Sequence, residues 1–259
     1  MGRVDYPIAL ADTLATELRL DGSGRLLDVG CGPGKFTLLM APWFEQVTGV
    51  DADRDMLAEA EQRATHAGVG NVQWRHLRAE ELPAGLGRHR VVSFAQSFHW
   101  MDQLEVARTA LGMLEDGGAC VHIHANTHDG VDTDAVLAHP RPPRTAINEL
   151  VERYLGPTQR HLRARLWADK AEREEDVWRA AGFSGPQRIE VPGEVVERTS
   201  DQILAAIFSL SSSTPHLFGE RREAFEVDLR RLLYDANPTE IFSEQMRDIA
   251  ADIWRPSKD

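Results

Sequence analysis

Short apolar runs alternate with amphipathic stretches over the first half of the chain. The runs have the length of strands, and the stretches between them carry apolar side chains at helical spacing. The predicted strands are 25–29, 46–50, 72–76, 90–95 and 119–124, and the predicted helices are 8–20, 34–44, 53–67 and 104–114. Strands that alternate with helices in this way indicate an α/β fold with a doubly wound, parallel sheet.

The pattern weakens between residues 126 and 169, where four prolines occur and the clear helical piece is 145–155. A segment of this length is uncommon as a simple connection between two elements. We therefore expect residues 126–169 to be an insertion that covers the active site as a lid. Its Tyr154, His161 and Trp167 are candidates for contact with a ligand.

Regular patterns return in the C-terminal part. Residues 171–181 are amphipathic and end at a glycine, which predicts a helix. Residues 187–191 and 195–199 are expected to pair as an antiparallel hairpin at the edge of the sheet. Residues 200–259 carry apolar positions at helical spacing and are expected to add two or three helices. We expect the whole chain, 1–259, to form a single domain.

Composition argues against several classes of protein. The chain has 259 residues, of which 42% are hydrophobic, enough for one large core. Its formal net charge of −12 repels phosphate backbones and argues against nucleic acid as a substrate. The basic residues Arg141 and Arg144 are expected in a solvated loop without a role.

Targeting and cysteine patterns point to a cytoplasmic protein. The N-terminus lacks the apolar core of a signal peptide, and no apolar stretch reaches the length of a membrane span. Cys31 and Cys120 are the cysteines of the chain, which supports neither a disulfide framework nor a zinc–thiolate site. Both are expected to be small core residues.

The strongest chemical pattern is three glycines, Gly30, Gly32 and Gly34, directly after the first predicted strand. Glycine tolerates the unusual φ values of a tight strand-to-helix turn, and it lets a ligand approach the backbone. The dinucleotide fingerprint needs its third glycine one position later, where this chain has Lys35, so a pyrophosphate cradle is disfavoured. Asp51 closes the second predicted strand, where a carboxylate can accept hydrogen bonds from both hydroxyls of a ribose.

Together, segments 26–37 and 47–51 resemble the first two motifs of the class I S-adenosylmethionine (SAM)-dependent methyltransferases. The resemblance continues through 79–83 and 114–118, and segment 96–100 is similar to the small-molecule, type 11-like branch of that family. It implies a Rossmann-like, mostly parallel seven-stranded sheet with an antiparallel edge hairpin. It also implies SAM as the methyl donor and S-adenosylhomocysteine as the co-product.

The resemblance implies a set of residues around the cofactor. These residues are Asp28, Gly30, Gly32, Gly34, Asp51, Ala79, Glu80, Gln96 and Trp100. Asp28 would engage the ammonium group of SAM, directly or through water, or cap the following helix, and Asp51 would hold the ribose. Asp53 could share the ribose or cap the next helix, and we expect the cap.

The expected adenine contacts depart from the family pattern. Many members have an acidic residue before the alanine of the third motif, whereas this chain has Arg78. The N–H of Ala79 could still bond to the adenine ring. Glu80 could supply the missing acceptor or could lie in solvent.

Segment 96–100 holds the candidate catalytic residue. His99 follows the fourth predicted strand, where the transferable methyl group should face the acceptor. Imidazole can take a proton near neutral pH, so His99 is a candidate general base or orienting group, with a structural histidine as the alternative. Trp100 is expected beside adenine or in the pocket wall. Methyl transfer needs alignment and exclusion of water more than it needs catalytic groups.

Three histidines occur close together in and after the fifth predicted strand. His122 and His124 are two positions apart and so face the same way, and His128 follows. A metal site needs at least three converging ligands, which this spacing does not supply, so no metal site is predicted. Core hydrogen bonding and pocket lining are the alternatives. His124 is the better pocket candidate, and Tyr6 could also touch a ligand.

The sequence therefore predicts a SAM-dependent methyltransferase that acts on an oxygen, nitrogen or carbon atom of a small organic molecule, as a monomer or homodimer. A sensor or partner subunit that binds SAM or S-adenosylhomocysteine without turnover is the alternative, slightly favoured by Arg78. A third hypothesis is a nicotinamide-dependent dehydrogenase, which would bind NAD at the same glycine loop.

Overall fold

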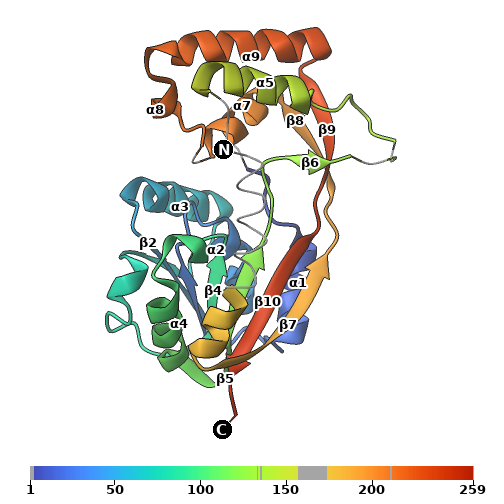
Figure 1. Cartoon of the computed structure of the whole chain (residues 1–259). Coiled ribbons are helices and arrows are strands. Elements are labelled where there is room, and N and C mark those ends of the chain that lie inside the picture. Colours follow the sequence, from blue (N-terminus) through green and yellow to red (C-terminus); the bar gives the residue numbers. More distant parts are fainter. Residues whose placement is uncertain (1–2, 133, 135, 157–173, 211, 259) are drawn as a thin grey trace. The chain divides into compact units, whose positions relative to one another are not determined.

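The computed structural model describes residues 3–132, 134, 136–156, 174–210 and 212–258. Packing divides the chain into two compact units, which Figure 1 shows coloured along the sequence. The sheet unit comprises Tyr6–Ala125, Trp167–Val191 and Asp248–Asp259, and the helical unit comprises Met1–Asp5, Asn126–Leu166 and Pro192–Arg247. Each unit is thus built from segments far apart in sequence. The expectation that 1–259 acts as one domain stays a prediction.

The sheet unit contains a seven-stranded sheet in the order β3-β2-β1-β4-β5-β10-β7. Its strands are β1 (Arg25–Val29), β2 (Gln46–Asp51), β3 (Val72–His76), β4 (His89–Ala95), β5 (Leu114–His124), β7 (Phe183–Val191) and β10 (Ile249–Pro256). Strands β1 to β5 pair in parallel, and β10 pairs antiparallel with both β5 and β7. The predicted α/β, Rossmann-like and mostly parallel sheet is confirmed.

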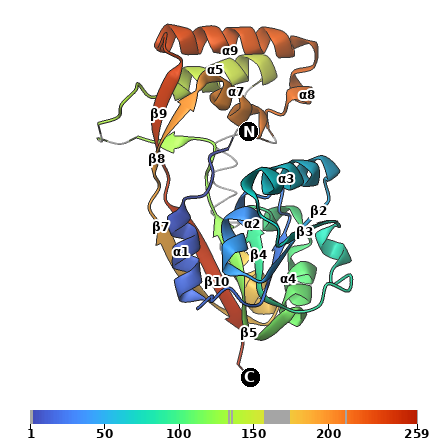
Figure 2. The same cartoon turned by 180° about the vertical axis from the view of Figure 1, so that it is seen from behind.

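Helices cover both faces of this sheet. They are α1 (Ile8–Glu17), α2 (Lys35–Met40), α3 (Arg54–Ala67) and α4 (Gln103–Gly112), with the short 3-10 helices η1 (Ala41–Trp43), η2 (Ala79–Glu81) and η3 (Phe98–Trp100). Residues 174–180 are also helical, as predicted for the described part of 171–181. Figures 1 and 2, which view the chain from opposite sides, show α4 and α1 on opposite faces of the sheet.

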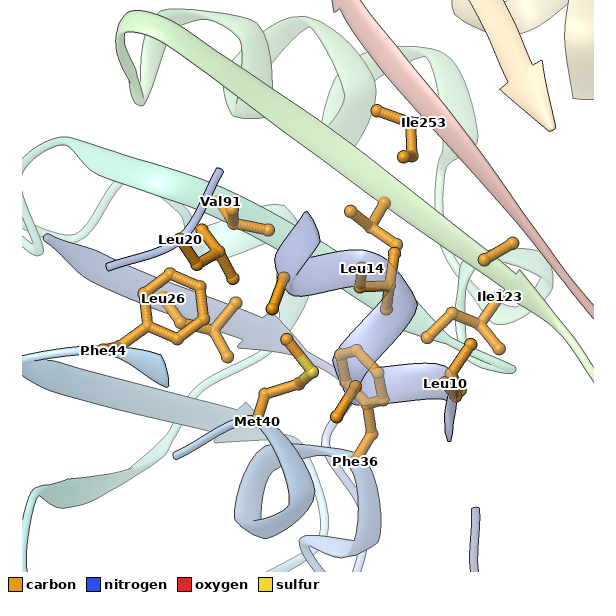
Figure 3. Close-up of a cluster of buried hydrophobic side chains, with 14 of the residues drawn as sticks. Leu10, Leu14, Leu20, Leu26, Phe36, Met40, Phe44, Val91, Ile123 and Ile253 are labelled. Atoms are coloured by element: carbon orange, nitrogen blue, oxygen red, sulfur yellow. The ribbon is translucent and has the colours of Figure 1, made fainter. Parts of the chain in front are cut away.

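Two hydrophobic cores lie on these two faces. Neighbouring residues of a strand point to opposite faces, so Val91 of β4 joins the first core and Val92 joins the second. The first core contains Leu14 of α1, Phe36 of α2 and Leu26 of β1, which Figure 3 shows among their neighbours. The central strands are nearly continuous apolar runs because both of their faces are covered.

The second core is built around Trp178, whose side chain is fully buried. Its ring stacks on Phe98 with the centroids 4.6 Å apart and on Trp254 with the centroids 5.8 Å apart. The edges of Phe94 and Phe183 complete the cluster at 5.6 and 5.1 Å. Phe98 belongs to η3, so this packing holds in place the turn that carries the candidate catalytic histidine.

The predicted hairpin between 187–191 and 195–199 is wrong. Strand β7 pairs with β10, whereas β8 (Val195–Thr199) pairs with β9 (Ile241–Met246) in a separate sheet of order β6-β9-β8. A Cβ on Gly193 would lie 2.1 Å from the carbonyl oxygen of Met246, so the chain after β7 passes directly against the end of β9. The pattern thus predicted two strands correctly and assigned both of them the wrong partner.

The helical prediction for 200–259 is correct in its first part and wrong in its last part. The structure has α7 (Ser200–Phe208), α8 (Pro215–Phe218), η4 (Gly219–Arg221) and α9 (Arg222–Ala236), followed by the strands β9 and β10. Residues 251–254 of β10 are all buried, because the strand lies between β5 and β7 and under both cores. Such continuous burial has no period that distinguishes a strand from a helix.

The helical unit has a core of its own. Helix α5 (Arg144–Leu155) packs there with α7, α8 and α9, and the unit also contains β6 (Gly130–Val131). Apolar residues of α7 and α9 meet in this core, namely Ile203, Leu204 and Ile207 with Phe225, Leu229 and Leu233. The lid role of 126–169 stays a prediction, and the candidates His161 and Trp167 lie outside the described residues.

Arg144 has a structural role, contrary to the solvated loop that was predicted. Its Nε donates to Oε1 of Glu244 at 2.8 Å, and Nη1 of Arg198 donates to the other oxygen of the same carboxylate at 3.2 Å. Glu244 and Arg198 are buried, where a charge is costly unless it is paired. Arg141 forms an ion pair with Asp132 at 3.2 Å. In the described part of the chain, no helix is long and apolar enough to cross a membrane.

The packing of α1 makes a testable prediction about stability. Leu14 is fully buried in the first core, so Leu14→Ala should lower the free energy of unfolding by about 2–5 kcal/mol. Ile8, on the same helix, is 71% exposed, and Ile8→Ala should change it by no more than about 0.5 kcal/mol. Urea denaturation of both variants measures the difference. Equal shifts for the two variants would contradict the packing.

Candidate functional site

Two close approaches shape the loop after β1. Gly30 has a φ of +68°, and a Cβ there would lie 2.5 Å from the Cβ of Ser97. A Cβ on Gly34 would lie 2.7 Å from the ring of Trp74. Packing therefore requires glycine at both positions. Around Gly32, in contrast, the space that a Cβ would occupy is open.

Asp51, at the end of β2, holds this loop from the neighbouring strand. Its Oδ2 accepts the backbone N–H of Gly32 at 2.7 Å, and its Oδ1 accepts the backbone N–H of Asp53 at 2.9 Å. Each carboxylate oxygen has two lone pairs, so both can accept a further bond from a ligand. Asp53 itself accepts the N–H groups of Asp55 and Met56, which confirms that it caps α3.

Asp28 is held inside the protein rather than facing a ligand. Its side chain is fully buried, and its two oxygens accept the hydroxyls of Thr37 at 2.6 Å and Ser93 at 2.7 Å. Burial raises the pKa of Asp28 to about 6, partly offset by these two hydrogen bonds. The direct ammonium contact expected of Asp28 is thus not supported, because no surface of the residue is accessible. Its carboxyl group instead joins β1 to α2 and β4.

A pocket of about 520 Å³ opens at the carboxyl ends of the parallel strands. Ligands of open α/β sheets bind at this edge, and the volume is typical of small-molecule sites. The lining residues that the sequence predicted are Gly30, Asp51, Ala79, Glu80 and Trp100. The pocket therefore brings together residues from four successive strand ends. The other predicted site residues lie outside the lining, namely Asp28, Gly32, Gly34, Gln96 and His99.

Several lining residues were not predicted as site residues. They are Ala52, His76, Leu77, Arg78, Glu81 and Met101. His76 ends β3 directly opposite Asp51 of β2, and its Nε2 lies 3.0 Å from the carbonyl oxygen of Ala52. His76 could have been predicted from the sequence, because the third strand of a parallel sheet ends at the same edge as the second. No pattern in the sequence predicts that Met101 lines the pocket.

The turn after β3 organises the other side of the pocket. The backbone N–H of Arg78 donates to Glu81 at 2.8 Å, and the guanidinium of Arg78 lies 3.5 Å from Glu80. Glu80 also accepts the backbone N–H of Asp102 at 3.1 Å, so it joins this turn to the start of α4. A hydrogen bond to its own backbone N–H is the largest of the contacts that lower the pKa of Glu80. Glu80 is therefore an ionised acceptor at the pocket.

The turn after β4 is tied to β1 and to the N-terminal segment. The hydroxyl of Ser97 donates to the carbonyl of Val29 at 2.5 Å. Gln96 adopts a φ of +58°, and its side-chain amide donates to the hydroxyl of Tyr6 at 2.8 Å. The backbone N–H of Gln96 also donates to the carbonyl of Ile123 at 3.3 Å, and Gln96 does not line the pocket.

His99 and Trp100 differ in their exposure. Trp100 is 70% exposed and borders the pocket, as expected of a residue in the pocket wall. His99 is half-buried, and its ring lies 5.0 Å from the ring of Trp100, measured between centroids. The proposed role of His99 at the reacting atoms stays a prediction.

The remaining candidates have other partners. The hydroxyl of Tyr154 donates to Asp228 at 2.8 Å, and His128 lies with the helical unit. His124 does not line the pocket, contrary to expectation. Cys31 and Cys120 are buried and unpaired by disulfides, as predicted, and burial raises the pKa of both thiols.

Comparison with known proteins links the first half of the chain to methyltransferases. Residues 26–118 match the family described as "Methyltransferase domain". The chain is 37% identical over 112 residues to the 27-O-demethylrifamycin SV methyltransferase of Amycolatopsis mediterranei (strain S699), which covers 42% of this chain and 41% of the relative. It is 35% identical over 112 residues to the trans-aconitate 2-methyltransferase of Rhodopseudomonas palustris (strain BisB18), with the same shares. The chain thus spans about two-fifths of the length of these curated relatives.

The fold extends further than the sequence similarity. The chain superposes on the YcgJ protein of Bacillus subtilis with a TM-score of 0.51, covering 96% of this chain and 98% of that one. The identity is 16%, so this likeness concerns the fold alone.

The burial of Asp28 makes a testable prediction about pH. Its pKa rises from 3.8 to about 6 on folding, so the folded state holds this proton more tightly. The protonated Asp28 therefore adds to the free energy of unfolding, fully below pH 3.8. This added stability is lost as the pH rises through 6, and for about two pKa units it amounts to about 3 kcal/mol. Asp28→Asn cannot ionise and should lack this part of the pH dependence. Urea denaturation of both proteins between pH 4 and 7 measures it, and parallel stability curves would contradict it.

Proposed function

We propose that the chain is a class I SAM-dependent methyltransferase, which transfers the methyl group of SAM to an oxygen, nitrogen or carbon atom of a small organic molecule. The pocket at the strand ends carries this proposal. It places the loop after β1, the carboxylate that ends β2 and the turn after β3 around one space of about 520 Å³. A cytoplasmic location and a monomeric or homodimeric state complete the proposal.

The residues of the pocket fit SAM. Asp51 lies in the lining with both oxygens able to accept further bonds, which suits the two hydroxyls of a ribose. Gly30 brings the backbone to the pocket surface without a side chain. Ala79 and Glu80 line the same space, where a backbone N–H and a carboxylate can recognise the edge of adenine. The fit is therefore with a nucleoside that has a free ribose.

Trp100 supports the same placement. A large apolar ring that is mostly exposed at a pocket is suited to packing against a planar base. Glu80 compensates for Arg78, which stands where many family members have an acid. Its carboxylate holds the guanidinium and still borders the pocket.

The proposed chemistry asks little of the protein beyond alignment. Bound SAM supplies an electrophilic methyl group on a sulfonium. The pocket walls hold the acceptor in line with that methyl group and exclude water. Where the acceptor must lose a proton, we propose that His99 of η3 takes it at a ring nitrogen.

A small-molecule acceptor is supported by two observations. The net charge of −12 disfavours nucleic acid, and the names of both curated relatives describe methyltransferases of small organic molecules.

Calorimetry with S-adenosylhomocysteine, followed by a methyl-donor assay over a broad panel of small acceptors, tests the function. Binding together with transfer to at least one acceptor is the expected result. Binding without transfer to any acceptor would support the sensor or partner subunit instead. Competition by NAD, with no binding of S-adenosylhomocysteine, would support a dehydrogenase.

Asp51 provides a matched test of the ribose contact. Asp51→Asn should weaken binding of S-adenosylhomocysteine about 10- to 100-fold, because hydrogen bonds to a charged acceptor contribute about 1.5–3 kcal/mol. Asp53→Asn, two residues away, should leave binding unchanged, since asparagine caps a helix about as well as aspartate. Calorimetry measures the affinity of both variants for S-adenosylhomocysteine. Equal affinities of the two variants would show that Asp51 does not bind the ribose.

His99 provides a test of proton transfer. His99→Gln should lower kcat about 10²- to 10⁴-fold while leaving the affinity for S-adenosylhomocysteine unchanged. The lost activity should return at high pH, where the acceptor ionises without a base. His66→Gln, a surface substitution on α3, is the control. An unchanged kcat for His99→Gln, or a loss that persists at all pH values, would exclude a general base.

A further inference from the structure

A second cluster of chemistry-bearing side chains lies within the sheet unit, at the end of β5. His122, His124 and Glu174 each offer a ligand atom, and these atoms lie within 4.8 Å of one another. The two histidines are alternate residues of one strand, with ring centroids 4.1 Å apart. Glu174 belongs to the helical residues 174–180, far from them in sequence. The fold thus adds a third donor to a pair that the sequence shows.

His124 has the outer partner that metal-bound histidines have. Its Nε2 lies 3.0 Å from Oδ2 of Asp252 on β10. Arg188 of β7 holds both oxygens of Asp252 at 2.7 Å, so the carboxylate, which is only 1% exposed, is kept in place. A histidine that donates the N–H of one ring nitrogen to a carboxylate keeps a lone pair on the other ring nitrogen, which can bind a metal ion.

Glu174 is held in a comparable way. Glu174 is buried, with only 8% of its surface exposed. Among the described residues, the side-chain amide of Gln103 donates to its Oε1 at 2.8 Å. Burial of a carboxylate with one amide donor is costly unless a cation balances the charge. The second oxygen, Oε2, can supply that contact.

We propose that His122, His124 and Glu174 bind one divalent transition-metal ion. Two imidazole nitrogens and one carboxylate oxygen are the donors of zinc and non-haem iron sites that keep open coordination positions. Calcium and magnesium prefer oxygen ligands, so the two nitrogens argue against them. The ring of His122 lies 5.3 Å from that of Phe98 in η3, measured between centroids. The ion therefore lies beside the turn that carries His99.

This site does not depend on the proposed methyl transfer. The proposal differs from the expectation drawn from the sequence, which was that the chain has no metal site. That expectation was based on the lack of a third ligand near His122 and His124 in sequence. The third ligand comes from a different element, brought there by the stacking of Trp178, four residues after Glu174, on Phe98.

Titration of the tag-free full chain with Co²⁺ after dialysis against a chelator tests the site. One equivalent should bind and produce visible absorption bands typical of a nitrogen–oxygen ligand set, and Zn²⁺ should displace it. Glu174→Gln should weaken Co²⁺ binding at least about 10- to 100-fold, and Gln103→Leu should weaken it by about the same factor through loss of the outer contact.

Two control variants separate this site from the protein surface. Glu175→Gln changes the neighbouring carboxylate, and His66→Gln removes a histidine on α3; both should bind Co²⁺ as the wild type does. Circular dichroism verifies that each variant is folded. Absence of the absorption bands, or equal affinities for Glu174→Gln and Glu175→Gln, would overturn the proposal. Calorimetry with S-adenosylhomocysteine on the same samples reports on the cofactor pocket separately.

Discussion

The site depends on how closely the loop after β1 passes the ends of its neighbours. The N–H groups of Gly30 and Cys31 both donate to the carbonyl of Val50, at 2.8 and 3.0 Å. On the other side, Ser97 donates to Val29 and leaves no room for a side chain on Gly30. This tight passage brings the ends of β1, β2 and β4 together. A wider loop would separate the carboxylate of β2 from the turn after β4, and the pocket would lose two of its walls.

Buried polar groups support this passage from beneath. Asp28 joins β1 to α2 and β4 through two hydroxyls, directly under the loop. The stack of Trp178 on Phe98 and Trp254 holds the turn after β4 from the opposite core. The hydrogen-bonded carboxyl of Asp28 therefore holds the loop after β1, and the aromatic packing around Trp178 holds the turn after β4. Both supports use residues that the ligand itself does not need to touch.

Sequence reasoning succeeded where the determinants are local. The strands 25–29 and 72–76 and the cap at Asp53 agree with the structure, because apolar runs, helical spacing and capping depend on neighbouring residues. It failed for the hairpin of 187–199 and for the strands of 241–256, because a strand pattern does not specify which distant strand will be its partner. Within the pocket, Asp51 and Glu80 could be foreseen from their motifs, whereas Met101 could not.

The sequence by itself indicated the resemblance to class I methyltransferases, the parallel part of the sheet and the carboxylate expected at the ribose, since the glycine spacing and Asp51 act through the backbone around them. The tertiary structure alone decided that Asp28 is buried, that β10 completes the sheet, and that Glu174 meets His122 and His124. Each of these outcomes depends on contacts between segments distant in the chain. Such contacts arise from packing and strand pairing across the whole fold, and patterns of neighbouring residues do not predict which distant segments will meet.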